Sequence, residues 1–301
     1  MGRRSRGRDI TGILLLDKPS GLTSNQALQR VKRLFDARKA GHTGSLDPLA
    51  TGLLPLCFGH ATKVSAFLLD ADKSYEVTAR FGAQTTTGDS QGEVQETTDS
   101  LPSTAAVDAA ALALTGDIEQ VPPMYSALKH KGRRLYTLAR EGIEVERPPR
   151  PVTIYAFERT AVDGPDMSFT VRCSKGTYVR TLVEDLAKLT GSLAHVAALR
   201  RKRVGAFVST GMHRLDELEE IAEQGMEALD ERLCPVDGAL MQWPAVTLGR
   251  ESAFFLLNGQ AVTTVGAPAA GQVRLYGQTG DFLGLGEVLQ DGRVAPRRLF
   301  R

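Results

Sequence analysis

The sequence predicts an α/β protein with a small, mostly β domain at its C-terminus. Over the first 240 residues, strand candidates with alternating or compact apolar residues are interspersed with amphipathic helix candidates. Near Trp243-Pro244 the texture changes to short apolar runs separated by glycines. The length of 301 residues is also more than a typical single domain needs, and 42% hydrophobic residues can form a buried core.

The first hundred residues alternate strand and helix signals. The run at 10–16 is compact and apolar and ends at Asp17-Lys18-Pro19-Ser20-Gly21, a loop signal. Residues 74–81 alternate apolar and polar side chains, which is typical of a half-buried strand. Between them we expect a helix capped by Ser24 or Asn25, a loop over 41–52 and a helix over 61–69, with a polar loop over 82–98 to follow.

The later elements have similar signals. Ser103 is expected to cap a short helix that ends before Val121-Pro122-Pro123, and a basic, irregular segment with a helix near 135–140 follows. Asp163-Gly164-Pro165 joins two strand candidates into a hairpin. The remaining expectations are a helix over 178–189, a basic extended segment over 194–207, two short acidic helices, and β structure from 246 onward.

Charge is segregated along the chain although the net charge is only +2. Basic residues gather at 125–155 and 172–203, and acidic residues at 216–231. This pattern fits a polyanion-binding face, but two ordinary solvated faces would give the same pattern, and charge alone does not decide between them.

Several classes of protein are disfavoured. No apolar run approaches the ~20 residues of a membrane span, and the basic N-terminus lacks a signal-peptide apolar region, so we expect a cytoplasmic protein. Cys57, Cys173 and Cys234 form no CxxC pair and are expected to be small buried side chains. P-loop, GxSxG, HExxH and dinucleotide-binding motifs are missing.

The most informative stretch is GHTGSLDPLATGLLP at 41–55. It is a tight loop that holds a carboxylate, in which Gly44 and Gly52 permit close backbone approach and Pro48 stiffens the residue after Asp47. A single loop aspartate usually forms a turn, so this loop alone does not establish a catalytic residue.

Read together with four further motifs, this stretch closely resembles the catalytic motif of the bacterial tRNA pseudouridine-55 synthases, the TruB family. Their order and spacing match the family over most of residues 10–210. The four motifs are KSYEV at 73–77, VPPMYSALK at 121–129, CSKGTYVRTL at 173–182 and GSLAHVAALRR at 191–201.

The resemblance implies a pseudouridine synthase fold, a mixed and largely antiparallel sheet flanked by helices. It implies a basic tail at 1–9 and a catalytic domain at 10–240. A mobile RNA-binding segment at about 124–151, here called the insertion, would close on RNA. Residues 246–301 are similar to a PUA domain, a small, β-barrel-like RNA-binding module.

The resemblance also assigns roles to individual residues. Asp47 matches the essential catalytic aspartate, Tyr75 the tyrosine that packs on the target base and acts as the base at C5, and Arg180 the arginine that pairs with the aspartate. The expected substrate-binding residues are His42, which occupies the space of the flipped nucleotide, Leu199, which lines the base pocket, and Lys63, Tyr178, Lys129 and Arg133.

The implied reaction isomerises uridine 55 in the T-loop of tRNA. It breaks the N1–C1′ bond, turns the base and rejoins it through C5, so neither a cofactor nor a metal is expected. An aspartate with a pKa of ~3.9 is ionised at neutral pH, as a nucleophile or base must be. Whether Asp47 attacks C1′, attacks C6 or removes the C2′ proton stays open.

The expected partner is the T-arm of tRNA, with no membrane and no guide RNA, bound by a monomer. Two alternatives remain. One is a non-catalytic tRNA-binding protein or folding chaperone, which the intact Asp47, Tyr75 and Arg180 disfavour. The other is a guide-RNA-dependent synthase of eukaryotic type, which the long insertion and the compact C-terminal domain disfavour.

Overall fold

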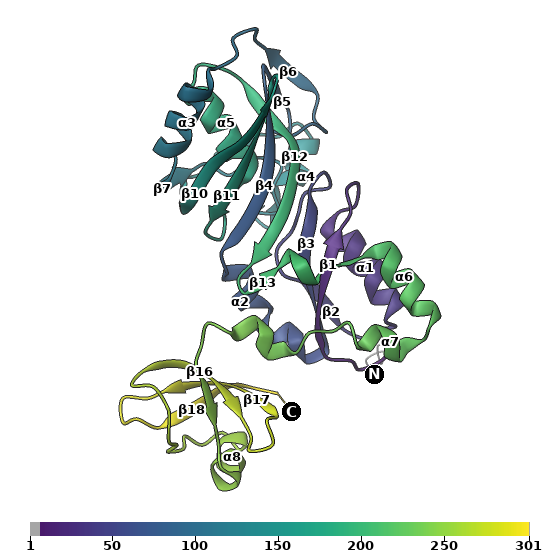
Figure 1. The fold of residues 1–301 in the computed structure, drawn as a ribbon, viewed down its shortest axis with the longest axis vertical. Coiled ribbons are helices and arrows are strands. Elements are labelled where there is room, and N and C mark those ends of the chain that lie inside the picture. Colours follow the sequence, from purple (N-terminus) through teal and green to yellow (C-terminus); the bar gives the residue numbers. More distant parts are fainter. Residues whose placement is uncertain (1–6, 301) are drawn as a thin grey trace.

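A computed structural model describes residues 7–300, and its centre is one large mixed sheet (Figure 1). Among these residues ten strands form it, in the order β14-β1-β3-β12-β4-β11-β10-β7, with β2 on β3 and β13 on β12. Most neighbouring strands are antiparallel, but β3 pairs in parallel with β12 and β1 with β14. The expected fold class is therefore confirmed.

The N-terminal elements follow the predicted order. The helix α1 is capped by Thr23 rather than by Ser24 or Asn25, because Gln26 at the third helical position completes a capping box: Thr23 Oγ1 accepts from Gln26 N at 3.2 Å and Gln26 Oε1 accepts from Thr23 N at 2.9 Å. The elements are β1 (Gly12–Lys18), α1 (Ser24–Leu34), β2 (Ala40–His42), β3 (Thr51–Phe58), η1 (Gly59–Val64) and α2 (Ser65–Asp70).

The predicted loops are shorter than expected. Both ends of 41–52 belong to strands, and 82–98 contains the hairpin of β5 (Ala83–Thr85) and β6 (Val94–Thr97). All four residues of β6 are exposed, so no apolar alternation marks it. Ser103 caps its helix as predicted. The other elements here are β4 (Lys73–Phe81), α3 (Thr104–Ala113) and β7 (Gly116–Gln120).

The insertion leaves the sheet at the end of β7 and returns at the start of β10. Its helix, α4 (Leu135–Arg140), lies where it was predicted, after the hairpin of β8 (Lys129–His130) and β9 (Arg133–Arg134). The predicted hairpin, central helix and basic strand are confirmed as β10 (Arg150–Asp163), β11 (Asp166–Cys173), α5 (Val179–Leu189) and β12 (Ala194–Val204).

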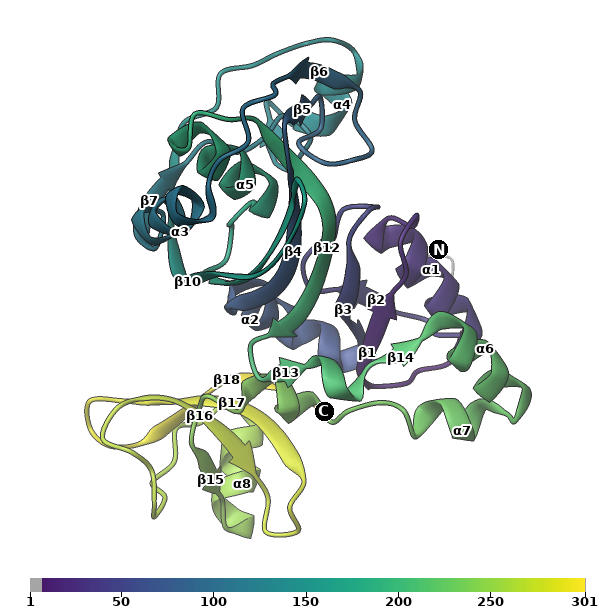
Figure 2. The same ribbon diagram turned by 45° about the horizontal axis from the view of Figure 1, so that its top comes forward.

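Helices cover the sheet on one side of its curve. Figure 2 shows α3 and α5 inside the arc formed by β10, β11, β4 and β12. Tyr75, Val77 and Leu199 belong to the buried cluster that these helices share with the sheet. The segments that follow β12 are β13 (Phe207–Val208), η2 (Ser209–Gly211), β14 (His213–Arg214), the acidic helices α6 (Leu215–Glu223) and α7 (Met226–Asp230), and η3 (Val236–Leu240).

The C-terminal part is a four-stranded sheet with one helix. Its helix α8 (Arg250–Leu257) was not predicted, because the run Phe254 to Leu257 has no helical periodicity that separates it from a short strand. The strands are β15 (Ala245–Thr247), β16 (Gly271–Tyr276), β17 (Phe282–Val288) and β18 (Val294–Leu299).

This sheet is fastened to η1 and α2 of the large part. The rings of Phe67 and Trp243 meet edge to face with centroids 4.8 Å apart. Lys63 Nζ donates to the carbonyl of Leu299 at 2.8 Å and lies 5.2 Å from the ring centroid of Phe300. At the other end of the chain, Arg8 of the expected basic tail pairs with Asp230, whereas residues 1–6 of that tail lie outside the described residues.

Residues 7–300 include no helix that combines the length and the apolar character needed to cross a bilayer.

Gly52 brings β3 against β12. Its φ is +95°, and a Cβ there would lie 2.4 Å from the carbonyl oxygen of Arg201. Gly52→Ala should therefore lower the free energy of unfolding by about 2–3 kcal/mol in denaturant titrations. Gly41→Ala is the matched control, since a Cβ at Gly41 would meet nothing within 4 Å. Equal stabilities of the two variants would contradict the close approach.

Candidate active site

A buried lysine holds the loop that carries Asp47. Lys18, at the end of β1, is fully buried and donates to the carbonyls of Pro19 at 2.8 Å, Leu22 at 2.6 Å and Pro48 at 3.4 Å. Burial lowers the pKa of Lys18 to about 8, although the charge of Asp47 opposes this. The lysine therefore joins the segment just before α1 to the carbonyl of Pro48, the residue after Asp47.

Arg180 and Asp47 form a two-pronged ion pair. Arg180 Nε lies 2.9 Å from Asp47 Oδ2, and Nη2 lies 3.2 Å from Oδ1. Nη1 also donates to the carbonyl of Thr87 at 2.6 Å, and Nη2 to that of Tyr125 at 2.8 Å. The arginine side chain is 5% exposed and the aspartate side chain 38% exposed. The carboxylate is thus fixed on one side and open on the other.

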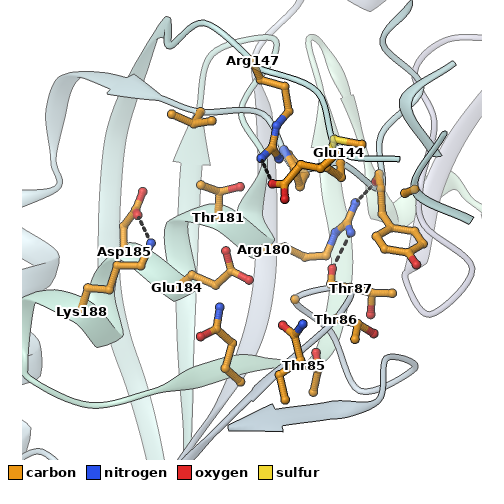
Figure 3. A pocket seen from close by; sticks show the side chains of 18 of the residues that line it. Thr85, Thr86, Thr87, Glu144, Arg147, Arg180, Thr181, Glu184, Asp185 and Lys188 are labelled. Atoms are coloured by element: carbon orange, nitrogen blue, oxygen red, sulfur yellow. Dashed lines mark hydrogen bonds and ion pairs between the residues drawn. The ribbon is translucent and has the colours of Figure 1, made fainter. Parts of the chain in front are cut away.

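Figure 3 shows Arg180 at the start of α5, with dashed lines to its carbonyl partners. A groove of about 590 Å³ lies beside it, between α5, β5 and the insertion. Glu184, Glu144 and Arg147 line this groove, and the last two pair at 3.0 Å.

The electrostatic balance at Asp47 combines opposing effects. Burial raises the pKa of Asp47 above its ordinary value, while Arg180 and Lys18 lower it and the nearby carboxylate of Asp89 raises it. The ion pair with Arg180, which includes a hydrogen bond from Nη2 to Oδ1, favours the ionised form.

Tyr75 and Leu199 come from the two paired central strands. Tyr75 on β4 lies opposite Arg201 on β12, and Val77 lies opposite Leu199. Tyr75 is 9% exposed and Leu199 8%. Burial raises the pKa of Tyr75, Arg201 opposes this, and the charge of Asp47 adds to it, so the phenol is neutral near pH 7.

His42 ends β2, directly before the loop that carries Asp47. Burial, Arg201 and Arg134 together lower the pKa of His42. The imidazole is therefore neutral near pH 7. Because Arg134 belongs to β9, its influence also indicates that the hairpin of the insertion lies close to this histidine.

The remaining predicted residues are spread over three places. Tyr178 is the N-cap of α5, two residues before Arg180. Lys129 and Arg133 are exposed on the hairpin of the insertion, where Arg133 pairs with Glu141. Lys63 has its amino group at the contact with the C-terminal sheet rather than among the residues around Asp47.

Two buried cations next to the loop that carries Asp47, Lys18 and Arg201, were not predicted from the sequence. Arg201 is 1% exposed and donates to the carbonyls of Leu53 at 2.7 Å and Gly44 at 3.2 Å. The alternation of side chains along a strand could have predicted this burial. Arg201 is two residues after Leu199, and side chains two positions apart on a strand point to the same face. Lys18 stood in a predicted loop and carried no such signal.

Several basic residues of the 172–203 cluster have internal partners. Besides the buried Arg201, Arg200 pairs with Asp17 at 2.7 Å and Lys202 with Glu76 at 2.9 Å. The C-terminal arginines Arg293 and Arg297 also pair, with Asp291 and Glu287. Most of these charges therefore have internal partners, and the unpaired basic side chains of the insertion are better placed to meet a polyanion.

Within residues 7–300, no group of three or more His, Cys, Asp or Glu residues is positioned to bind a metal ion. Cys57 and Cys173 are buried, as expected of small apolar side chains, and Cys234 is half-buried.

Three family models together match most of the chain. They describe the N-terminal domain of TruB family pseudouridylate synthase at 32–179, the C-terminal domain of tRNA pseudouridylate synthase B at 180–241, and the C-terminal part of pseudouridine synthase II TruB at 244–300. This chain belongs to the TruB family. It is accordingly a tRNA pseudouridine synthase, an isomerase.

Curated TruB proteins are similar along their whole length. "tRNA pseudouridine synthase B" of Nitrosococcus oceani is 54% identical over 298 residues, covering 99% of this chain and 97% of that protein. The protein of the same name from Pseudomonas aeruginosa is 55% identical over 295 residues, covering 98% and 97%.

Two solved chains with a similar fold come from larger assemblies. A chain of a Cbf5-Nop10-Gar1 complex matches with a TM-score of 0.74 at 25% identity, covering 96% of this chain and 85% of that one. A chain of an H/ACA RNP bound to a substrate RNA matches with a TM-score of 0.73 at 22% identity, over the same shares.

The raised pKa of Asp47 predicts an acid limb in the rate profile of this TruB enzyme. If the ionised carboxylate is required, single-turnover pseudouridine formation should fall as pH drops through a midpoint above ~4, the range of a free aspartate. The measurement is the rate at saturating enzyme between about pH 4 and pH 8.5. A rate that stays constant down to about pH 4 would contradict it.

Proposed function

We propose that this enzyme isomerises uridine 55 in the T-loop of tRNA, with Asp47 as the essential carboxylate. The observation that supports this most directly is the Asp47–Arg180 pair. The arginine is buried and the carboxylate keeps an open side, and Tyr75, Leu199 and His42 occupy the adjoining strands.

The reaction needs a group that assists the break between N1 and C1′. Arg180 keeps Asp47 oriented and favours its charged form, so the carboxylate can serve as a nucleophile or base when RNA excludes water. After the base has turned, C5 bonds to C1′ and loses its proton, and N1 gains one, so no atom is gained or lost overall. Whether Asp47 acts at C1′, C6 or the C2′ proton remains open.

Tyr75 is proposed to pack on the target base and to receive the C5 proton. A phenol with a raised pKa is protonated at neutral pH and is then hardly basic, so Tyr75 would first give its proton to another group or to water, and the resulting phenolate would receive the C5 proton. The positive charge of Arg201 opposes the rise in the Tyr75 pKa and would stabilise a transient phenolate.

A uridine inside a folded T-loop must leave its stack to reach Asp47, which costs a few kcal/mol. Neutral His42 offers a flat surface for the vacated space, and Leu199 an apolar wall for the base. Lys129 and Arg133 of the insertion, with the adjacent Arg134, would attract the backbone phosphates. Lys63 and Tyr178 are also proposed to contact the RNA.

We further propose a monomeric cytoplasmic enzyme, with the catalytic part at 10–240 and a PUA-like RNA-binding part at 246–301. It would need no guide RNA. The similar solved chains come from a Cbf5-Nop10-Gar1 complex and from an H/ACA RNP, but the relatives that match nearly end to end are bacterial. A purely binding or chaperone role is disfavoured by the intact ion pair.

The test is to map pseudouridine in a bare tRNA transcript after incubation with the purified protein. We expect one new pseudouridine, at position 55, without added guide RNA. Asp47→Asn should reduce single-turnover formation by at least about 1000-fold, because a neutral amide is neither nucleophile nor base, while tRNA affinity changes little.

The matched control is Asp163→Asn, an exposed aspartate of the β10–β11 turn, which should retain the full rate. Modification at a different uridine would refute the substrate assignment. An Asp47→Asn rate within tenfold of wild type would refute the role of Asp47.

Tyr75→Phe separates packing from proton transfer. The phenyl ring keeps the apolar contact, but the only hydroxyl proposed to lie at C5 is lost, so we expect a loss of about 100-fold or more in the single-turnover rate. Binding of the tRNA transcript, measured by filter retention, should stay within about threefold. Near-normal turnover by this variant would show that another group or water takes the proton.

A further inference from the structure

The side chain of Gln120 is bound to the backbone at the start of α5. Gln120 Oε1 accepts from Tyr178 N at 2.7 Å, and Gln120 Nε2 donates to Tyr178 O at 3.1 Å. One amide group thus pairs with both polar backbone groups of a residue 58 positions away, as a neighbouring strand would. The glutamine is 2% exposed, so water does not compete for these bonds.

This contact fixes the N-cap residue of α5. Tyr178 is the N-cap of α5, and its own side chain makes no capping hydrogen bond. The N-cap sets the direction in which a helix begins. Because Arg180 lies in the first turn of this helix, whatever fixes Tyr178 also fixes the base of the Arg180 side chain.

Gln120 also marks the root of the insertion. It is the last residue of β7 and pairs with Arg150, the first residue of β10. The insertion therefore leaves the sheet and returns to it at this one pair. A second contact between the two regions is the bond from Arg180 Nη2 to the carbonyl of Tyr125 at 2.8 Å.

We propose that Gln120 is a positioning residue for pseudouridine formation. It orients the first turn of α5 so that Arg180 forms its ion pair with Asp47, and it ties that alignment to the root of the RNA-binding insertion. The inference rests on the proposed roles of Asp47 and Arg180. Gln120 itself touches neither the base nor Asp47.

Gln120→Ala removes both hydrogen bonds, and Gln120→Glu keeps the shape but replaces the donor with a second acceptor. Both should lower the single-turnover rate at saturating enzyme by about 10- to 100-fold at pH 8, since a small displacement of a reacting group has an effect of that size. Affinity for the tRNA transcript should stay within about threefold, because the buried amide contacts no phosphate.

The pH dependence of Gln120→Glu is the decisive readout. A protonated glutamic acid has one donor and one acceptor, like the amide it replaces, and burial favours the protonated form. The rate of the variant relative to wild type should therefore recover as pH falls from about 8 to about 5.5. The ratio cancels the common effect of Asp47 protonation.

Gln29→Ala, an exposed glutamine on α1, is the control and should retain the full rate. A Gln120→Glu rate within twofold of wild type at pH 8, or a deficit that does not change with pH, would overturn the proposal. If Gln120→Ala fails to fold, the isosteric Gln120→Glu variant still tests the proposal.

Asp47→Asn is measured in parallel. An active Asp47→Asn variant would refute the proposed function. An inactive Asp47→Asn variant together with normal Gln120 variants would refute only the positioning role of Gln120.

Discussion

The site depends on the hydrogen bonds and the ion pair formed by the buried guanidinium of Arg180. Its three nitrogens reach Asp47 on the loop before β3, Thr87 after β5 and Tyr125 in the insertion. These segments lie far apart in the sequence, and a charge that is 5% exposed needs all of these partners to remain buried. The same contacts that stabilise the cation therefore bring together the Asp47 carboxylate, the loop after β5 and the insertion.

Much of the fold could be predicted from the local pattern of apolar, polar and turn-forming residues. Alternation at 74–81, the turn at Asp163-Gly164-Pro165 and the amphipathic helix at 178–189 all lie where the sequence placed them, because each buries one regular face. An element is not predicted where its apolar residues do not repeat with the period of one helix or strand face. The exposed strand β6 has a single apolar residue, Val94, which is not buried, and the run of apolar residues in α8 fits a strand as well as a helix.

The candidate site was predictable as a set of residues but not as an arrangement. Family resemblance selected Asp47, Tyr75 and Arg180, whereas the buried cations Lys18 and Arg201 look like surface charges in the sequence. Each becomes buried because backbone carbonyls satisfy it, and no sequence pattern reports where a remote carbonyl will point. The charge pattern likewise did not decide between a basic face and ordinary solvated faces, because it does not report ion pairs such as those of Arg200 with Asp17 and Lys202 with Glu76.

The order of strands in the large sheet has a consequence for how the chain is made on the ribosome. Strands β3 and β4 are close in sequence, yet β12 lies between them. Until residue 204 has left the exit tunnel, both strands expose unpaired edges that can associate with other nascent chains. The loop that carries Asp47 also packs against β12 through Gly52, so its packing stays incomplete during most of translation. A translation product that ends before β12 would therefore be prone to aggregation and inactive rather than partly active.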